Sequence, residues 1–117
     1  MKHSVFPGSR SGTVKIPASK SMAHRLLIAA ALGKDSKILH FDGFSNDIGA
    51  TIVCLRALGA QITSDGRALR VQPVTEQAHG AADCGESGAT LRFLLPVAAA
   101  LGKHTAFHLH GRLPQRP

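Results

Sequence analysis

Apolar positions recur along this chain at two spacings, one typical of strands and one typical of helices. Residues 13–16 (TVKI) alternate polar and apolar side chains just before a proline, which predicts a short strand. The apolar-rich stretch that follows predicts a helix that begins at Ser19 or Ser21 and ends at Gly33. Residues 37–41 (KILHF) predict the next strand.

The middle of the chain continues this alternation of strands and helices. Residues 45–47 (SND) offer several N-cap side chains, and the apolar positions after them recur at helical spacing as far as Gly59. Two short strands, over residues 60–63 and 68–74, flank a Ser-Asp-Gly turn and predict a hairpin. A polar linker follows over residues 75–82. The predicted order is β-α-β-α-β-β, which indicates an α/β (α+β) fold.

An internal repeat extends this pattern. Residues 29–34 (AAALGK) recur as residues 98–103, and each copy is followed by a strand-like run that contains a histidine and then a glycine. Alanine-rich helices that end at glycine are common enough for such a match to arise by chance. Because loop, helix and strand recur in the same order, we favour a true repeat, with one unit over about residues 13–74 and an incomplete second unit over residues 83–117.

An incomplete second unit has a consequence for solubility. We expect residues 1–117 to be an N-terminal fragment of a larger protein, whose unpaired strand edges and apolar side chains promote self-association. The side chains expected to lie uncovered are Phe93, Leu94, Val97, Leu101, Phe107 and Leu109.

Composition narrows the class of protein. With 117 residues, 44% apolar content, five Phe and no Trp or Tyr, the chain fits one globular domain, or part of one, with an aliphatic core. Cys54 and Cys84 do not form a disulfide framework and indicate free thiols in a reducing compartment. No signal peptide follows Met1, and the longest apolar run, residues 93–101, is too short to span a bilayer. These features predict a cytoplasmic protein without a membrane partner.

The formal net charge of +7 indicates an anionic partner. Lysine and arginine are scattered singly, and the chain has neither a basic run nor an aromatic stacking platform. We therefore favour small anionic molecules over nucleic acid. A basic nucleic-acid-binding module remains the alternative from a different class.

Two polar segments stand directly before predicted helices. The first polar segment, residues 17–25 (PASKSMAHR), places Lys20 between two serines at the start of a helix. A helix N-terminus attracts anions through its unpaired N–H groups and its partial positive charge. Ser21 and Arg25 are four residues apart and share a helix face, so they can reach one ligand. The alternative for Lys20 is a solvated surface lysine.

The second polar segment, residues 84–92 (CGESGATLR), has the same design. Gly85 and Gly88 allow the backbone to approach a ligand closely, and Arg92 adds a full positive charge. No Gly-Lys-Ser/Thr follows, so this is not a Walker loop, and an ordinary helix-entry turn is the alternative.

Other side chains with potential chemistry carry less weight. His108 and His110 lie two residues apart on a predicted strand, but no spacing of Cys and His matches a structural zinc site, and we expect no bound metal. Asp42 and Asp47 are candidates for acid/base chemistry, although Asp47 is better explained as a helix cap.

These motifs together resemble one family, 3-phosphoshikimate 1-carboxyvinyltransferase (EPSP synthase). The matching elements, in order, are residues 16–21 with Arg25, residues 45–47, residues 85–92 and Arg116-Pro117. The resemblance covers nearly all of the chain and about the first quarter of that enzyme. It implies transfer of the enolpyruvyl group of phosphoenolpyruvate to the 5-hydroxyl of shikimate 3-phosphate, with release of phosphate, in aromatic amino-acid synthesis. It also implies two domains, each of three β-α-β-α-β-β units, with the substrates in the cleft between them.

The resemblance also implies roles for individual residues. The residues that would bind shikimate 3-phosphate are Lys20, Ser21 and Arg25, and those that would bind phosphoenolpyruvate are Lys20, Gly88, Arg92 and Arg116. Lys20 would contact both substrates and serve in catalysis. No cofactor is implied.

Three positions depart from the family pattern. Ala18 replaces a usual glycine, Glu86 stands where asparagine is common, and Ala89 stands where threonine is frequent. A carboxylate at residue 86 is unfavourable beside an anion unless it pairs with a cation or caps a helix.

Two further expectations concern activity. The family's acid/base carboxylate would lie beyond residue 117, so we expect the chain alone to be inactive. The related enolpyruvyl transferase that acts on UDP-N-acetylglucosamine is the nearest alternative, but it carries Lys-Asn where this chain has Lys20-Ser21.

Overall fold

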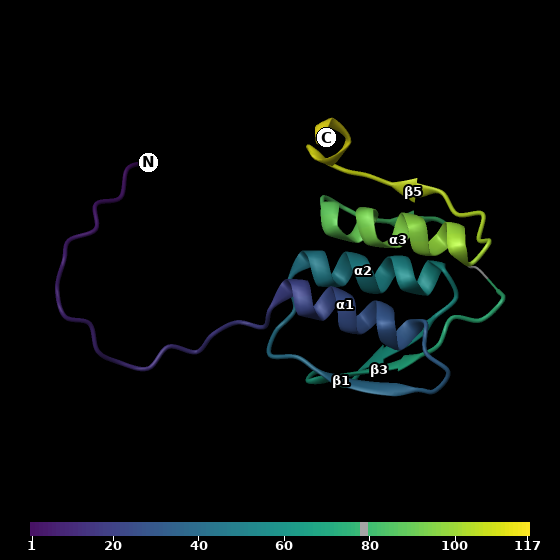
Figure 1. Cartoon of the computed structure of the whole chain (residues 1–117), viewed down its shortest axis with the longest axis horizontal. Coiled ribbons are helices and arrows are strands. Elements are labelled where there is room, and N and C mark those ends of the chain that lie inside the picture. Colours follow the sequence, from purple (N-terminus) through teal and green to yellow (C-terminus); the bar gives the residue numbers. More distant parts are fainter. Residues whose placement is uncertain (78–79) are drawn as a thin grey trace.

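The computed structural model describes residues 1–77 and 80–117. The first 18 residues extend away from a folded body, in which helices cover a small sheet (Figure 1). The elements, in chain order, are α1 (Lys20–Ala31), β1 (Lys37–His40), α2 (Asn46–Ala57), β2 (Gln61–Ser64), β3 (Ala68–Gln72), β4 (Ala82–Asp83), α3 (Gly88–Ala100), β5 (Phe107–His108) and the 3-10 turn η1 (Leu113–Gln115). The predicted α/β class is confirmed.

A three-stranded antiparallel sheet in the order β1-β3-β2 forms the base of the body. The predicted hairpin joins β2 to β3, with Ile62 opposite Val71. Its turn is held by the Asp65 carboxylate, which accepts hydrogen bonds from the Ala68 N–H at 2.9 Å and the Arg67 N–H at 3.4 Å. The strand and turn prediction for this region is confirmed.

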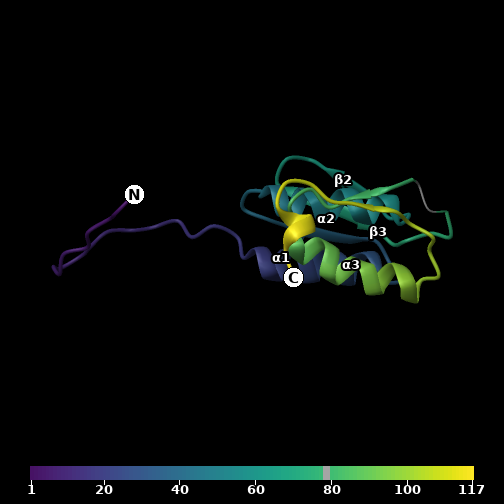
Figure 2. The same cartoon turned by 90° about the horizontal axis from the view of Figure 1, so that it is seen from above.

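The strand predicted for residues 13–16 is wrong. Val14 and Ile16 are 83% and 81% exposed, and the segment leaves the body in both views (Figures 1 and 2). Alternation describes a strand that has one face to bury and a neighbour to pair with. This segment has neither within the described residues, so the pattern alone does not produce a strand.

A second, two-stranded sheet belongs to the C-terminal part. β4 and β5 pair in parallel, and α3 connects them, which gives a β-α-β crossover. Backbone hydrogen bonds extend the pairing, from the Cys84 N–H to the His108 carbonyl at 2.9 Å and from the His110 N–H to the Gly85 carbonyl at 2.8 Å. β4 begins inside the predicted linker, two of whose residues, 78 and 79, lie outside the described part.

The core lies between the helices and the three-stranded sheet and continues beneath α3. In Figure 1 the three helices lie side by side and run in the same direction, with α2 in the middle. The large side chains that are fully buried include Leu27, Ile48, Leu55, Leu58, Val71 and Leu94. Leu94 was expected to lie uncovered, and that expectation is wrong because α3 packs against α2. Leu95 and Leu101 on the same helix are exposed.

Gly59 ends α2 in a way that only glycine permits. Its φ is +108°, and a Cβ there would lie 2.4 Å from the carbonyl oxygen of Gln77. The Ala60 N–H donates to the Leu55 carbonyl at 3.0 Å, which closes the helix in a Schellman motif.

The two cysteines lie beneath these helices as free, buried thiols. Their sulfur atoms are 3.8 Å apart, and burial raises the pKa of both Cys54 and Cys84. In the described ranges, 1–77 and 80–117, no helix combines the length and the apolar character needed to cross a membrane.

Candidate anion-binding site

The three helices begin at the same end of the body, and each begins with a serine (Figure 1). The hydroxyls of Ser19, Ser45 and Ser87 accept hydrogen bonds from the backbone N–H of the third residue of each helix, at 3.4, 3.3 and 3.2 Å. Ser19, of the two predicted candidates, is therefore the N-cap of α1. The positive ends of three helix dipoles converge at this end of the molecule.

Lys20 is paired with the middle helix. Its ammonium lies 3.2 Å from the Asp47 carboxylate, and both side chains are more than a third exposed. Because Ser45 caps α2, Asp47 lies in the first turn, and the prediction that Asp47 is the cap is wrong. Asp42 lies outside this group and pairs loosely with Lys15 at 3.9 Å.

Arg25 links α1 to α3. Its guanidinium carbon lies 5.4 Å from the centre of the Phe93 ring, and the same group donates to the Ser21 carbonyl at 2.9 Å. This hydrogen bond reaches the backbone of Ser21 one helical turn earlier, as the spacing of four residues on α1 allows. Phe93 also meets the ring of His24 edge-on at 6.4 Å. The first polar segment therefore touches the first turns of α3 directly.

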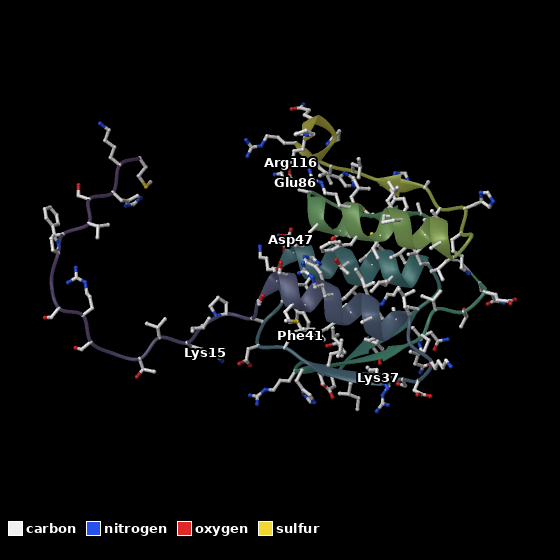
Figure 3. The ribbon with its side chains drawn as sticks, in the orientation of Figure 1. Lys15, Lys37, Phe41, Asp47, Glu86 and Arg116 are labelled. Atoms are coloured by element: carbon white, nitrogen blue, oxygen red, sulfur yellow. The ribbon has the colours of Figure 1, made fainter. Side chains whose placement is uncertain are left out.

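A cavity of about 640 Å³ opens where α3 begins. The residues that line it are Asp47, Glu86, Ser87, Gly88, Ala89, Arg92, Phe93 and Arg116. Figure 3 labels Asp47, Glu86 and Arg116 at this end of the molecule.

Gly88, Arg92 and Arg116, three residues predicted for one ligand, thus meet at one cavity. Lys20, Ser21 and Arg25 lie outside its lining and join it through Asp47 and Phe93. The Arg92 guanidinium donates to the carbonyl of Pro117.

The Glu86 side chain makes a hydrogen bond to a distant part of the backbone, which could not be predicted from its position in the sequence. Its carboxylate accepts a hydrogen bond from the Arg112 N–H at 3.1 Å. The neighbouring Gly111 has φ +56°, and a Cβ there would lie 1.6 Å from the Glu86 carboxylate. Glu86 therefore holds the turn that leads to η1 and Arg116.

Asp83 braces the loop before α3. Its carboxylate accepts from the Gly85 N–H at 2.8 Å and lies 3.1 Å from a ring nitrogen of His110. The backbone hydrogen bond from Gly85, followed by the contact with His110, lowers the pKa of the Asp83 carboxyl. β5 ends at His108, so His110 lies beyond the strand on which it was predicted. Within the described residues, no three His, Cys, Asp or Glu side chains gather closely enough to hold a metal ion.

A buried chain of polar side chains connects the three helices, and sequence reasoning missed it. His24 Nδ1 lies 2.7 Å from the Thr51 hydroxyl, which lies 2.8 Å from the Thr90 hydroxyl, which donates to the Ser87 hydroxyl at 2.7 Å. Polar residues on the buried faces of α1, α2 and α3 were the available signal. Their mutual contacts depend on how the helices dock.

The geometry defines the class of protein: an α/β unit in which cationic side chains gather near the N-termini of three helices. A family model described as EPSP synthase (3-phosphoshikimate 1-carboxyvinyltransferase) matches residues 7–117, and the chain belongs to this family.

Individual relatives agree with this assignment. The chain is 45% identical over 123 residues to a 3-phosphoshikimate 1-carboxyvinyltransferase of Clostridium beijerinckii, covering 97% of this chain and 28% of the relative. It is 40% identical over 120 residues to the protein of that name from Clostridium botulinum strain Alaska E43, with the same two coverages. An EPSP synthase structure from Acinetobacter baumannii shares the fold, with a TM-score of 0.79 at 21% identity over 91% of this chain and 25% of that one. The chain thus spans little more than a quarter of the length of these curated relatives.

Proposed function

We propose that this chain supplies part of the substrate-binding surface of an enzyme that transfers the enolpyruvyl group of phosphoenolpyruvate to the 5-hydroxyl of shikimate 3-phosphate and releases phosphate. The observation that carries the proposal is the gathering of cations around three helix N-termini at one end of the body. Both substrates carry a phosphate and a carboxylate, which such a surface binds well. The names of the Clostridium relatives support this choice of substrates.

The first polar segment is the proposed site for shikimate 3-phosphate. Lys20, Ser21 and Arg25 are all exposed, so their donor groups can reach a ligand without rearrangement of the core. Arg25 is held by its contact with Phe93, which limits the side-chain entropy lost on binding. Lys20 would exchange its Asp47 partner for a substrate anion and contact both substrates, in keeping with a catalytic role.

The second polar segment is the proposed site for phosphoenolpyruvate. Gly88 stands at the first turn of α3, where the absence of a side chain lets an anion approach the backbone N–H groups. Arg92 and Arg116 line the same cavity from two different elements, so they can bind a carboxylate and a phosphate together.

Catalysis needs groups that this part of the family does not contain, so we propose that the chain alone gives no turnover. Exposed Ile38, Leu95 and Leu101 support the related proposal that the chain self-associates. We also propose a cytoplasmic location, which rests on the biosynthetic reaction, and we propose neither nucleic acid, membrane nor cofactor as a partner.

The test uses a chimaera in which this chain replaces the matching segment of the Clostridium beijerinckii relative. Phosphate release from the two substrates measures its activity. We expect turnover in the chimaera. Arg25→Ala should raise KM for shikimate 3-phosphate about tenfold or more, because a charge-assisted contact is lost. Arg70→Ala removes an equally exposed arginine from β3 and should leave KM unchanged. A cooperatively folded chimaera without turnover, or equal effects of the two substitutions, would contradict the proposal.

A further inference from the structure

The buried polar chain is unusual because every member is almost fully enclosed. His24 and Ser87 are 2% and 4% exposed, and Thr51 and Thr90 are 0% exposed. The chain crosses from α1 through α2 to the N-cap of α3, so it ties the first polar segment to the cavity. Buried hydroxyls this close must share their protons in a defined order.

Counting protons gives that order. Each hydroxyl has one proton to donate. The Thr90 hydroxyl has two acceptors in reach, the Ser87 oxygen at 2.7 Å and the Asp47 carbonyl at 3.3 Å, and the shorter contact takes its proton. With that proton donated, the Thr51 hydroxyl must be the donor in the contact between the two threonines. Thr51 then has to accept a hydrogen bond from His24, which requires the proton of His24 to reside on Nδ1.

This order of proton donation determines what the Ser87 hydroxyl can do at the cavity. The Ser87 oxygen accepts from both the N–H and the hydroxyl of Thr90. Its two acceptor sites are filled, and its own proton is left to donate. Ser87 lines the cavity beside Gly88.

We propose that Ser87 donates its hydroxyl proton to an anionic oxygen in the cavity, and that His24, Thr51 and Thr90 are positioning residues that orient this donor. The inference rests on the proposed function in one respect, that the cavity binds an anion. It adds a binding residue at the N-cap of α3 and explains why a histidine lies buried behind it.

The surroundings of His24 are consistent with a neutral ring. Burial lowers the pKa of His24, Asp47 on α2 acts in the opposite direction, and Lys20 and Arg25 on its own helix lower it further. On the α3 side the ring meets Phe93, which carries no charge. A neutral imidazole has a single N–H, so its position is a measurable signature of the chain.

Nitrogen-15 NMR of the imidazole in the full 117-residue chain tests the proton order. We expect the Nδ1–H tautomer for His24, retained to a pH below the ordinary pKa range of imidazole. Thr51→Val, which keeps the side-chain shape and removes the hydroxyl, should abolish this preference. An Nε2–H tautomer of His24 in the wild-type chain would overturn the proposed order.

Titration with inorganic phosphate, followed through the amide signals of Gly88 and Ala89, tests the positioning role. Thr51→Val should weaken phosphate binding about tenfold, and Thr51→Ser should restore it, because serine keeps the hydroxyl. Thr63→Val, at an exposed position of β2, is the matched control and should have no effect.

A second pair of substitutions keeps the test decisive if Thr51→Val does not fold. His24→Asn places an amide N–H near the Nδ1 position and should retain binding, whereas His24→Leu should lose it. If the wild-type chain binds phosphate and Thr51→Val or His24→Leu binds it equally tightly, the positioning role alone is overturned. Failure of the wild-type chain to bind phosphate would contradict the proposed anion site as well.

Discussion

The first and second polar segments have the same local design and different surroundings. Each places a serine N-cap before a helix that ends in Leu-Gly-Lys. Ser19 is exposed and follows a segment that has left the body, whereas Ser87 is 4% exposed and follows β4. Asp83 and Glu86 brace the second segment through backbone N–H groups at 2.8 and 3.1 Å.

The difference shows that a capped helix becomes a rigid site through what holds the loop before it. The second polar segment is preorganised, because hydrogen bonds fix its loop, its N-cap and the turn bearing Arg116. Two of the bonds that hold it, between Thr90 and Thr51 and between Glu86 and Arg112, join residues far apart in the sequence.

In the first polar segment, the loop before the helix is largely exposed, and the contacts that hold the segment come from α1 itself, through His24 with Thr51, Lys20 with Asp47 and Arg25 against Phe93. In an enzyme with two anionic substrates, such a pairing would give one firm site and one that adapts on binding.

Removing the two N-cap hydroxyls gives the largest expected contrast. Ser87→Ala should lower the free energy of unfolding by about 2 kcal/mol, because it removes a cap and the closer acceptor of the buried Thr90 hydroxyl, which is left with the Asp47 carbonyl at 3.3 Å. Ser19→Ala removes only an exposed cap and should lower it by about 0.5–1 kcal/mol. Denaturant unfolding measures both values, and equal losses would show that the two segments do not differ as described.

Much of this contrast lies beyond what sequence patterns reveal. The helices and the hairpin follow from local signals, such as Ser45 before an apolar helix and Asp65 in a turn, and they form where predicted. Residues 13–16 carry a strand pattern and form no strand, because pairing depends on a neighbour the pattern does not contain.

The candidate site likewise contains residues that sequence motifs reveal and contacts that they do not. Gly88, Arg92 and Arg116 were found from the motifs that carry the family resemblance, and they meet at one cavity. The contact between Glu86 and Arg112 and the chain from His24 to Ser87 join residues far apart in the sequence. Such contacts are set by helix docking, and no local spacing records them.

Lowering the pH should reveal a smaller contrast, in how the free energy of unfolding depends on the bracing of the second polar segment. The lowered pKa of Asp83 means that its bracing contributes stability above the ordinary carboxyl range, and that this contribution is lost as pH falls through the folded-state pKa. Unfolding measured between about pH 7 and pH 3 should show a steeper loss for the wild-type chain than for Asp83→Asn. Asp65→Asn, in the β2–β3 turn, is the comparison, because its carboxyl pKa is also lowered by backbone hydrogen bonds and it lies away from the cavity. Identical curves for the wild-type chain and Asp83→Asn would remove Asp83 from the account of the second segment.

If the proposed function is right, both polar segments should bind the anionic substrates of the family's reaction, each its own. Two-dimensional NMR of the chain, titrated first with shikimate 3-phosphate and then with phosphoenolpyruvate, tests it most directly. We expect saturable shifts centred on Lys20, Ser21 and Arg25 for the first ligand and on Gly88 and Arg92 for the second. Shifts spread evenly over exposed cations such as Lys37 and Arg70, or confined to one segment for both ligands, would contradict it.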